Sequence, residues 1–185
     1  MIGGTGEHSA VMLRTGDLVL RPIAAGEQDQ TRAWANDPAL QRLILRAGEV
    51  TPEDQRRWFE RLQADPSRQV FAVLEKGLHV GNTGFYHLDR THRRAEFWIL
   101  IGRPEARGRG LGGAALRLML GHGFGALGLH KICLHVGEGN APAIRLYEKF
   151  GFRRESLLRE HYLIEGAWVN VIGMSLLRSE YDGEK

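Results

Sequence analysis

Alternation of apolar and polar residues predicts most of the strands of this protein. The clearest case is the segment 95–101, where odd and even positions differ in character, so that we expect two distinct faces. The odd face carries Phe97, Ile99 and Ile101, and the even face carries Glu96, Trp98 and Leu100. Further strands are predicted over 18–23, 70–75, 79–88, 131–136, 159–165 and 167–177.

Helices are predicted where apolar residues recur every three or four positions instead of every second one. Residues typical of helix starts and ends flank these amphipathic segments. Thr51 followed by Pro52 is typical of a helix N-terminus, and Gly151 of a helix end. The predicted helices cover 27–36, 52–64, a segment through Leu116 and Leu120, and 141–150. Because helices are interspersed with strands but three strands are consecutive, we expect an α/β (α+β) fold with a mixed, mostly antiparallel sheet of about seven strands flanked by helices.

The chain shows no linker and no internal repeat, and 185 residues suit one domain. We therefore expect a single domain over 13–180, with a flexible N-terminus at 1–12 and a tail at 181–185. The N-terminus lacks the features of a signal peptide, and no apolar run is long enough to span a membrane. Cys133 is the only cysteine, so a reducing, cytoplasmic location is expected.

The charge pattern excludes several function classes. The formal net charge is +3, and the charged residues are interspersed, so we expect no nucleic-acid partner and no membrane partner. The eight histidines and the single cysteine show no metal-ligand spacing, so no metal site is predicted.

Glycine is enriched, with 24 in the chain, and twelve of them lie between Gly102 and Gly151. Residues 102–113 form a glycine-rich turn between a predicted strand and a predicted helix, where backbone N–H groups and the helix dipole favour a phosphate. Arg107 and Arg109 could add charge-assisted hydrogen bonds. The run 108–113 also fits G-x-G-x-x-G, which keeps a dinucleotide-dependent oxidoreductase as an alternative, although six residues separate it from the strand end.

Two motifs together resemble those of the GNAT superfamily of N-acetyltransferases. Residues 107–112 match R-x-x-G-x-G, and residues 140–152 match N-x-x-A-x-x-L-Y-x-x-x-G-F, in the same order as in that superfamily. The resemblance implies a GNAT-like fold, acetyl-CoA as co-substrate without a metal, and acetyl transfer to an amine. A non-catalytic acyl-CoA-binding protein of the same fold is the alternative.

The resemblance also implies roles for individual residues. Tyr147 matches the position of the general acid that protonates the leaving thiolate, and either Glu96 or His135 would act as base. The residues implied in acetyl-CoA binding are Leu100, Ile101, Gly102, Arg107, Gly108, Arg109, Gly110, Leu111, Gly112, Gly113 and Asn140. Asn140 fits the cap of the following helix equally well.

The resemblance implies that the acceptor is an amine of a small molecule, such as a polyamine or a nucleotide-linked amino sugar, or of a peptide N-terminus. Residues 18–22 and 34–38 resemble the ribosomal-protein branch of the superfamily, and residues 93–97 and 129–136 are similar to the polyamine and nucleotide-amino-sugar branches. The ribosomal-protein branch has glutamate at the position of His135, and this departure counts against a ribosomal-protein substrate. Candidate residues for the acceptor side are Trp34, Arg46, Trp58, Tyr86, Tyr162 and Trp168.

Two points stay open at this level. Dimers are common among relatives, but the sequence does not select between a monomer and a homodimer. Four glycines, Gly121, Gly123, Gly125 and Gly128, fall where a helix is expected and should weaken it by about 1 kcal/mol each relative to alanine.

Overall fold

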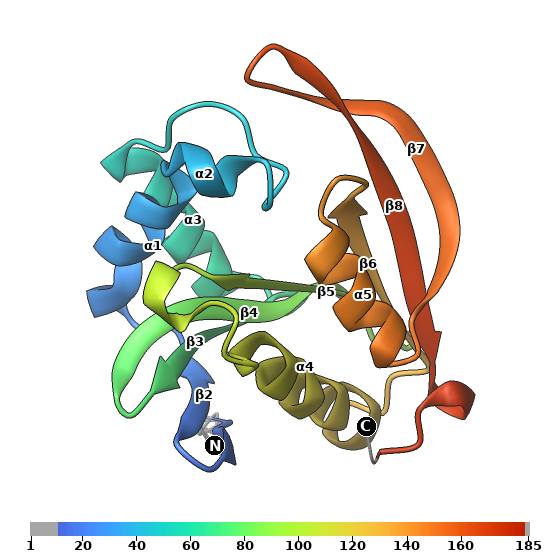
Figure 1. The fold of residues 1–185 in the computed structure, drawn as a ribbon. Coiled ribbons are helices and arrows are strands. Elements are labelled where there is room, and N and C mark those ends of the chain that lie inside the picture. The colour runs from blue at the N-terminus through green and yellow to red at the C-terminus, as the bar shows by residue number, and fades with distance from the viewer. Residues whose placement is uncertain (1–10, 184–185) are drawn as a thin grey trace, which may run out of the picture.

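A computed structural model describes residues 11–183 as a mixed α/β fold (Figure 1). The strands are β1 (Leu13–Thr15), β2 (Leu18–Pro22), β3 (Gln69–Glu75), β4 (Leu78–Asp89), β5 (Arg94–Ile101), β6 (Lys131–Gly137), β7 (Arg153–Ile164) and β8 (Ala167–Leu177). The helices are α1 (Gln28–Ala35), α2 (Pro38–Gln41), α3 (Pro52–Ala64), α4 (Leu111–Gly121) and α5 (Ala141–Lys149). Residues 1–10 of the predicted flexible N-terminus and the last two residues of the predicted tail, 184–185, lie outside the described residues.

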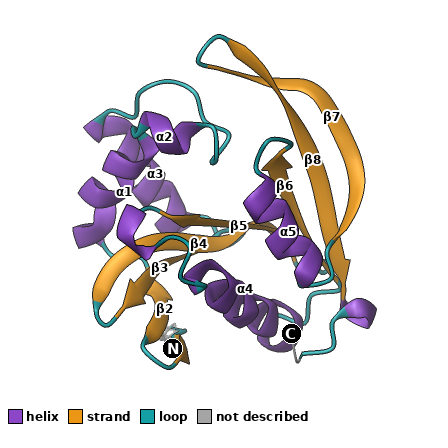
Figure 2. Cartoon of the chain, in the orientation of Figure 1, coloured by secondary structure: helices purple, strands orange, loops and turns teal. Residues whose placement is uncertain are grey.

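The strands form one sheet in the order β1-β2-β3-β4-β5-β6-β8-β7 (Figure 2). Every neighbouring pair is antiparallel except β5 and β6, which are parallel. The predicted mostly antiparallel sheet is confirmed. It has eight strands rather than about seven, because β1 is only three residues long and too short for alternation to reveal it.

The central feature of the sheet is the separation of β5 from β6. Their register covers only Arg94–Lys131, Ala95–Ile132 and Glu96–Cys133, after which the two strands diverge (Figure 1). The sheet therefore has two wings, β1–β5 and β6–β8, joined along three residue pairs.

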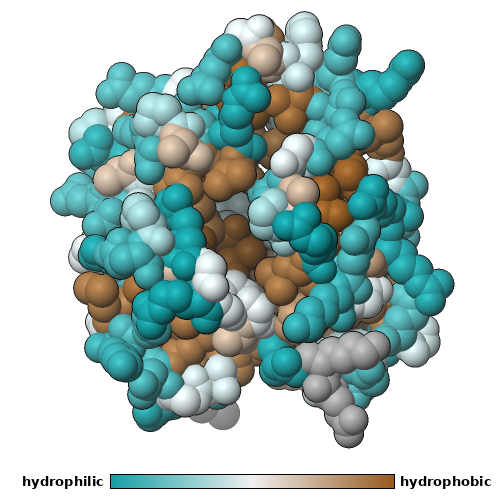
Figure 3. Space-filling model, in the orientation of Figure 1, coloured by the Kyte–Doolittle hydropathy of each residue, from teal (hydrophilic) through white to brown (hydrophobic). Residues whose placement is uncertain are grey.

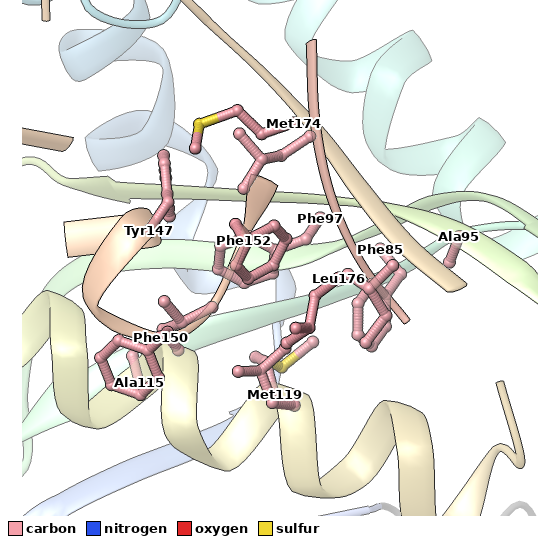
Figure 4. Close-up of a cluster of buried hydrophobic side chains, with 14 of the residues drawn as sticks. Phe85, Ala95, Phe97, Ala115, Met119, Tyr147, Phe150, Phe152, Met174 and Leu176 are labelled. Atoms are coloured by element: carbon pink, nitrogen blue, oxygen red, sulfur yellow. The ribbon is translucent and has the colours of Figure 1, made fainter. Parts of the chain in front are cut away.

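Each face of the sheet carries its own hydrophobic core. On one face α4 and α5 cover the larger core, in which Phe85, Phe97 and Met119 are fully buried (Figure 4). On the other face Trp58 of α3 packs with Tyr86 and other side chains against a smaller cluster. The two faces of β5 thus belong to different cores, as its alternation predicts.

The helix starts follow the predicted chemistry. Thr51 accepts a hydrogen bond from the Asp54 backbone N–H, and Asp54 accepts one from the Thr51 N–H, which together form a capping box at α3. Asn140 caps α5 by accepting from the Ala143 N–H at 3.3 Å. The four-residue helix α2 was not predicted, since it is shorter than one full amphipathic repeat.

The glycines after α4 have separate explanations. The chain continues as a π-helical turn over His122–Ala126 and does not simply extend α4. A side chain at Gly123 would come within 2.8 Å of Ile132 and 3.0 Å of Phe85, and Gly128 has φ +62°. Gly123 is therefore required by close packing and Gly128 by a left-handed backbone. Neither reason applies to Gly121 or Gly125.

The C-terminal end of the described residues is packed against the fold. Tyr181 stacks on Phe124 with ring centroids 4.9 Å apart, so packed structure reaches the first residue of the predicted tail.

Within residues 11–183, none of the helices has the length and apolar character needed to cross a membrane.

Candidate active site

The divergence of β5 and β6 opens a cavity of about 650 Å³. Figure 3 shows it as a central hollow in which hydrophobic side chains gather. The motif residues at its wall are Glu96, Leu100, Ile101, Arg107, Gly108, Gly110, Leu111, Gly112, Gly113, His135, Asn140 and Tyr147. One cavity therefore collects twelve of the fourteen predicted site residues.

The cavity has two halves, because side chains of a strand alternate between its faces. We call the first the α4 half; its wall consists of Phe97, Ile99, Ile101, Ala106, Arg107, Gly108, Gly110, Leu111, Gly112, Gly113, Val136, Asn140, Pro142, Ala143, Leu146 and Tyr147. The second is the α2 half, with Leu40, Leu43, Ile44, Leu45, Tyr86, Glu96, Trp98, Leu100, His135 and Tyr162. The halves meet where β5 and β6 diverge.

Backbone groups of β5 point into the cavity at odd positions. The Gly102 N–H donates to the Val80 carbonyl on the β4 side, whereas the Arg93 carbonyl accepts from Lys131 on the β6 side. Because backbone groups alternate along a strand, Ile99 and Ile101 direct theirs toward the opening and Leu100 directs its own toward β4. The sequence assigned this role to Leu100, Ile101 and Gly102; the geometry supports Ile101 and adds Ile99.

The glycine loop presents free N–H groups at the start of α4. Gly108 and Gly110 have φ values of +71° and +81°, which a side chain would strain. Gly110 is the N-cap of α4 and provides no side-chain cap. Within residues 11–183 no protein acceptor meets the N–H groups of Leu111, Gly112 and Gly113. Helix dipole and free donors together make this turn suitable for a phosphate.

The two arginines of the loop do not behave alike. Arg107 donates to the carbonyls of Ile101 (2.9 Å) and Gly102 (2.6 Å), so its guanidinium holds the loop against the end of β5. Arg109 forms a two-pronged ion pair with Glu75 at 2.7 and 2.8 Å, outside the cavity wall.

Gly102 also lies outside the wall. A side chain there would come within 2.1 Å of the Trp34 ring, so this glycine allows Trp34 to pack on the backbone. The contact of Gly102 with acetyl-CoA stays a prediction. Trp34, a candidate for the acceptor side, is buried at 5% exposure and lies outside the cavity wall.

Tyr147 lies on α5, in the wall of the α4 half. Its ring meets Phe97 edge-on at 6.4 Å, and the residue is only 7% exposed (Figure 4). Burial raises the pKa of its hydroxyl to about 12. The phenol therefore keeps its proton at neutral pH, as a general acid requires.

Glu96 and His135 form one hydrogen-bonded pair. His135 Nδ1 lies 2.9 Å from Glu96 Oε1, two residues beyond Cys133, which is the register partner of Glu96 on β6. An ionised carboxylate can only accept, so Nδ1–H donates and Nε2 keeps a lone pair for a proton. The two residues that the sequence offered as alternative bases thus lie within hydrogen-bonding distance of each other. His87, which the sequence did not single out, lies 3.8 Å from the other oxygen of Glu96.

The single cysteine is a neighbour of this pair and not part of it. The Cys133 thiol donates to the Ala95 carbonyl at 3.4 Å. Burial, and then the charge of Glu96, raise the pKa of this thiol, which keeps it protonated and a poor nucleophile.

Two of the six residues predicted for the acceptor side lie in the cavity wall, Tyr86 and Tyr162. Trp58 lies behind Tyr86 and donates to its hydroxyl at 3.3 Å. Trp168 is 60% exposed at the end of the β7–β8 hairpin. The sequence missed Leu40, Leu43, Ile44 and Leu45, because the segment around α2 shows no motif.

A split, mostly antiparallel sheet, with a glycine loop and a buried tyrosine at the split, defines the class of acyl-CoA N-acyltransferase folds. Residues 17–153 match the family model described as acetyltransferase (GNAT) domain. The chain belongs to this family, which confirms the resemblance found in the sequence.

Relatives from two of the predicted branches are similar to this chain. Spermidine N(1)-acetyltransferase of Escherichia coli (strain K12) is 37% identical over 120 residues, which are 65% of this chain and 64% of that protein. The putative ribosomal N-acetyltransferase YdaF of Bacillus subtilis (strain 168) is 29% identical over 129 residues, 69% of each chain. The match to the spermidine enzyme thus spans just under two thirds of its length.

A solved structure is similar over nearly the whole chain. The crystal structure of spermidine N-acetyltransferase from Vibrio cholerae in complex with CoA and spermine has a TM-score of 0.85 at 28% identity, covering 90% of this chain and 99% of that one. The GNAT fold expected from the sequence is therefore confirmed.

Proposed function

We propose that this protein is an acetyl-CoA-dependent N-acetyltransferase that transfers the acetyl group directly to a primary amine. The observation that carries the proposal is that one cavity holds a phosphate-suited glycine loop, a buried protonated tyrosine and a carboxylate–histidine pair. The family membership of the chain and the CoA in the similar structure from Vibrio cholerae support it.

The α4 half fits acetyl-CoA. The free N–H groups of Leu111, Gly112 and Gly113 would hold the pyrophosphate, and the open space at Gly108 and Gly110 allows it to approach the backbone. The inward backbone groups of Ile99 and the N–H of Ile101, whose carbonyl accepts from Arg107, would hydrogen-bond the amide-containing arm and polarise the acetyl carbonyl. Acetyl-CoA supplies an activated acetyl group as a thioester.

The Glu96–His135 pair removes the proton that blocks attack. Alkyl ammonium groups have pKa values of about 10, so the amine enters the site protonated. The apolar α2 half disfavours the charged form, and the pair accepts the proton at His135 Nε2 while Glu96 stabilises the resulting imidazolium. The neutral nitrogen then forms the new C–N bond, and its second proton, which must leave to give the amide, passes to solvent.

Tyr147 acts on the departing sulfur. As the C–S bond breaks, the phenol donates a hydrogen bond, and then its proton, to the thiolate; the tyrosinate recovers a proton from solvent. Thiols in water have pKa values of about 8.5, below the value of about 12 for Tyr147. Transfer therefore depends on the thiolate also being desolvated, since burial raises its proton affinity as it does that of the phenol.

The test is a thiol-release assay with acetyl-CoA and a panel of amines, together with calorimetric titration of acetyl-CoA. We expect binding and amine-dependent release of one CoA thiol per acetylated amine. Binding without release on any amine would favour the non-catalytic acyl-CoA-binding alternative. No binding of acetyl-CoA by folded protein would exclude both, and protection by NAD but not by CoA would favour the oxidoreductase alternative.

The cellular location and the oligomeric state also belong to this proposal. The single, poorly reactive Cys133 thiol fits a reducing compartment, so we propose a cytoplasmic location, to be checked by fractionation. A homodimer stays a prediction, which light scattering of the purified protein decides.

A further inference from the structure

The α2 half of the cavity is mainly apolar. Four of its ten wall residues, Leu40, Leu43, Ile44 and Leu45, come from the segment that begins with α2. Tyr86 stacks on Trp98 with ring centroids 5.4 Å apart, which adds a flat aromatic surface. Leu43 and Tyr162 are 44% and 40% exposed, so the mouth of this half is apolar as well. Apolar surface left open in a cavity is stabilised by an apolar occupant.

Carboxylates are scarce in the same wall. Within residues 11–183, Glu96 is the one acidic residue among those that line the cavity, and it is already paired with His135. A polyamine carries a second ammonium group that would need its own partner, because a desolvated, unpaired charge is costly. The α2 half provides none.

The cations around this half point to the same conclusion. The guanidinium carbon of Arg68 lies 5.2 Å from the centroid of the Tyr86 ring. Arg46 acts electrostatically on the Tyr86 hydroxyl. At the hairpin tip Glu165 is paired with Arg42 at 3.3 Å. Arg68 is itself paired with Asp65 at 2.9 Å, so the carboxylates of Asp65 and Glu165 are already occupied and do not offer a free partner to a second ammonium group.

Leu45 is held in an unusual backbone conformation at this wall. Its φ is +53°, a value that non-glycine residues rarely adopt. A side chain at Gly137 would come within 3.3 Å of the Leu45 Cδ2 atom, so this leucine reaches across to the end of β6. Backbone strain of this kind persists where the surroundings enforce it, often at a ligand site.

We infer that the acceptor is a primary monoamine carried on an apolar aliphatic or aromatic group, and not a polyamine. This inference rests on the proposed function and specifies its acceptor. The single ammonium is served by the Glu96–His135 pair, and the apolar group by the leucines and the Tyr86–Trp98 stack. The chain thus differs in acceptor chemistry from the spermidine acetyltransferases to which it is similar.

Calorimetric titration of amines into the protein, with and without saturating CoA, tests this inference without relying on turnover. We expect 2-phenylethylamine to bind at least tenfold more tightly than spermidine. Leucinamide and a short peptide with N-terminal leucine present the same chemistry and distinguish a small-molecule from a peptide source. Equal or tighter binding of spermidine, or no binding of any monoamine, would overturn the inference.

A substitution in the wall gives a second measurement. Leu45→Asn removes apolar contact while asparagine tolerates the left-handed backbone, so we expect the monoamine to bind about tenfold more weakly with spermidine unaffected. Leu78→Asn, at an exposed leucine outside the cavity, is the matched control and should change neither. Unchanged monoamine binding in Leu45→Asn would count against the inference. If amines bind as expected but no thiol is released, the proposed function fails while the assignment of the pocket stands.

Discussion

The two halves of the cavity are built on different principles. The α4 half uses the backbone: inward groups of β5, free N–H groups at the start of α4 and glycines with positive φ, all within residues 97–147. The α2 half uses side chains from segments far apart in the sequence, from Leu40 to Tyr162. Backbone recognition suits a co-substrate that never changes, and side-chain recognition suits an acceptor that differs between relatives.

The largest expected effect is at Tyr147, in the wall of the α4 half. Tyr147→Phe keeps the ring packing but removes the proton donor, so kcat should fall about 10²- to 10⁴-fold, with binding of acetyl-CoA and amine unchanged. Initial rates and calorimetry measure the two quantities separately. A rate within threefold of the wild type would remove Tyr147 as the acid.

The Glu96–His135 pair should behave as one unit of the α2 half. We expect Glu96→Gln and His135→Gln each to lower kcat at pH 7 about a hundredfold, and the double variant to be at most a few-fold worse. Glu155→Gln, which breaks an ion pair with Lys131 outside the cavity, is the control. Fully additive losses would mean that the two residues serve separate steps.

Alkaline unfolding tests how dry the α4 half is around Tyr147. Below about pH 10 both the folded and unfolded states keep the phenol proton, so burial adds no pH dependence there. Between about pH 10 and 12 the unfolded state loses it first, so the free energy of unfolding should fall by about 2–3 kcal/mol as pH rises. Urea unfolding at pH 9 to 12 should show this fall reduced in Tyr147→Phe but not in Tyr162→Phe, at an exposed tyrosine. An identical fall in Tyr147→Phe would mean that water reaches the hydroxyl.

Two glycines with the same backbone offer a matched test of the loop. Gly110 and Gly77 both have φ +81° and no atom within 4 Å of an added side chain. Alanine should therefore cost about 1–2 kcal/mol of stability at either position. Only Gly110→Ala should also weaken acetyl-CoA binding, by about tenfold, because the added carbon occupies the phosphate approach. An equal loss of affinity in Gly77→Ala would show that the effect is not local.

The smallest effect is expected at Arg109. Its guanidinium is paired with Glu75 on the surface, so Arg109→Gln should change acetyl-CoA affinity by threefold or less. Calorimetry in low salt measures it. A loss of tenfold or more would mean that Arg109 leaves Glu75 to bind the phosphate, as the motif alone implied.

The same contrast explains what could be predicted from the sequence. The glycine spacing and the alternation of β5 located the α4 half, because backbone geometry imposes residue types at fixed intervals. The α2 half was largely missed: a leucine such as Leu45 has the same sequence pattern whether it packs in a core or lines a cavity. The pairing of Glu96 with His135 depends on β5 and β6 being neighbours, which no local pattern reveals.

The separation of β5 from β6 also affects the risk that the protein aggregates. It creates a sheet edge in the interior at Ile99 and Ile101, where β6 is no longer paired with β5 and Arg107 binds the Ile101 carbonyl. Exposed edges of this kind recruit strands from other chains. The outer edges are blunted: β1 has three residues, and β7 is bulged and rich in charge. The interior edge is flanked by α5 and the β7–β8 hairpin (Figure 1), so a slender molecule reaches it more easily than a foreign strand. The protein thus keeps unpaired backbone where binding needs it and hides it from other chains.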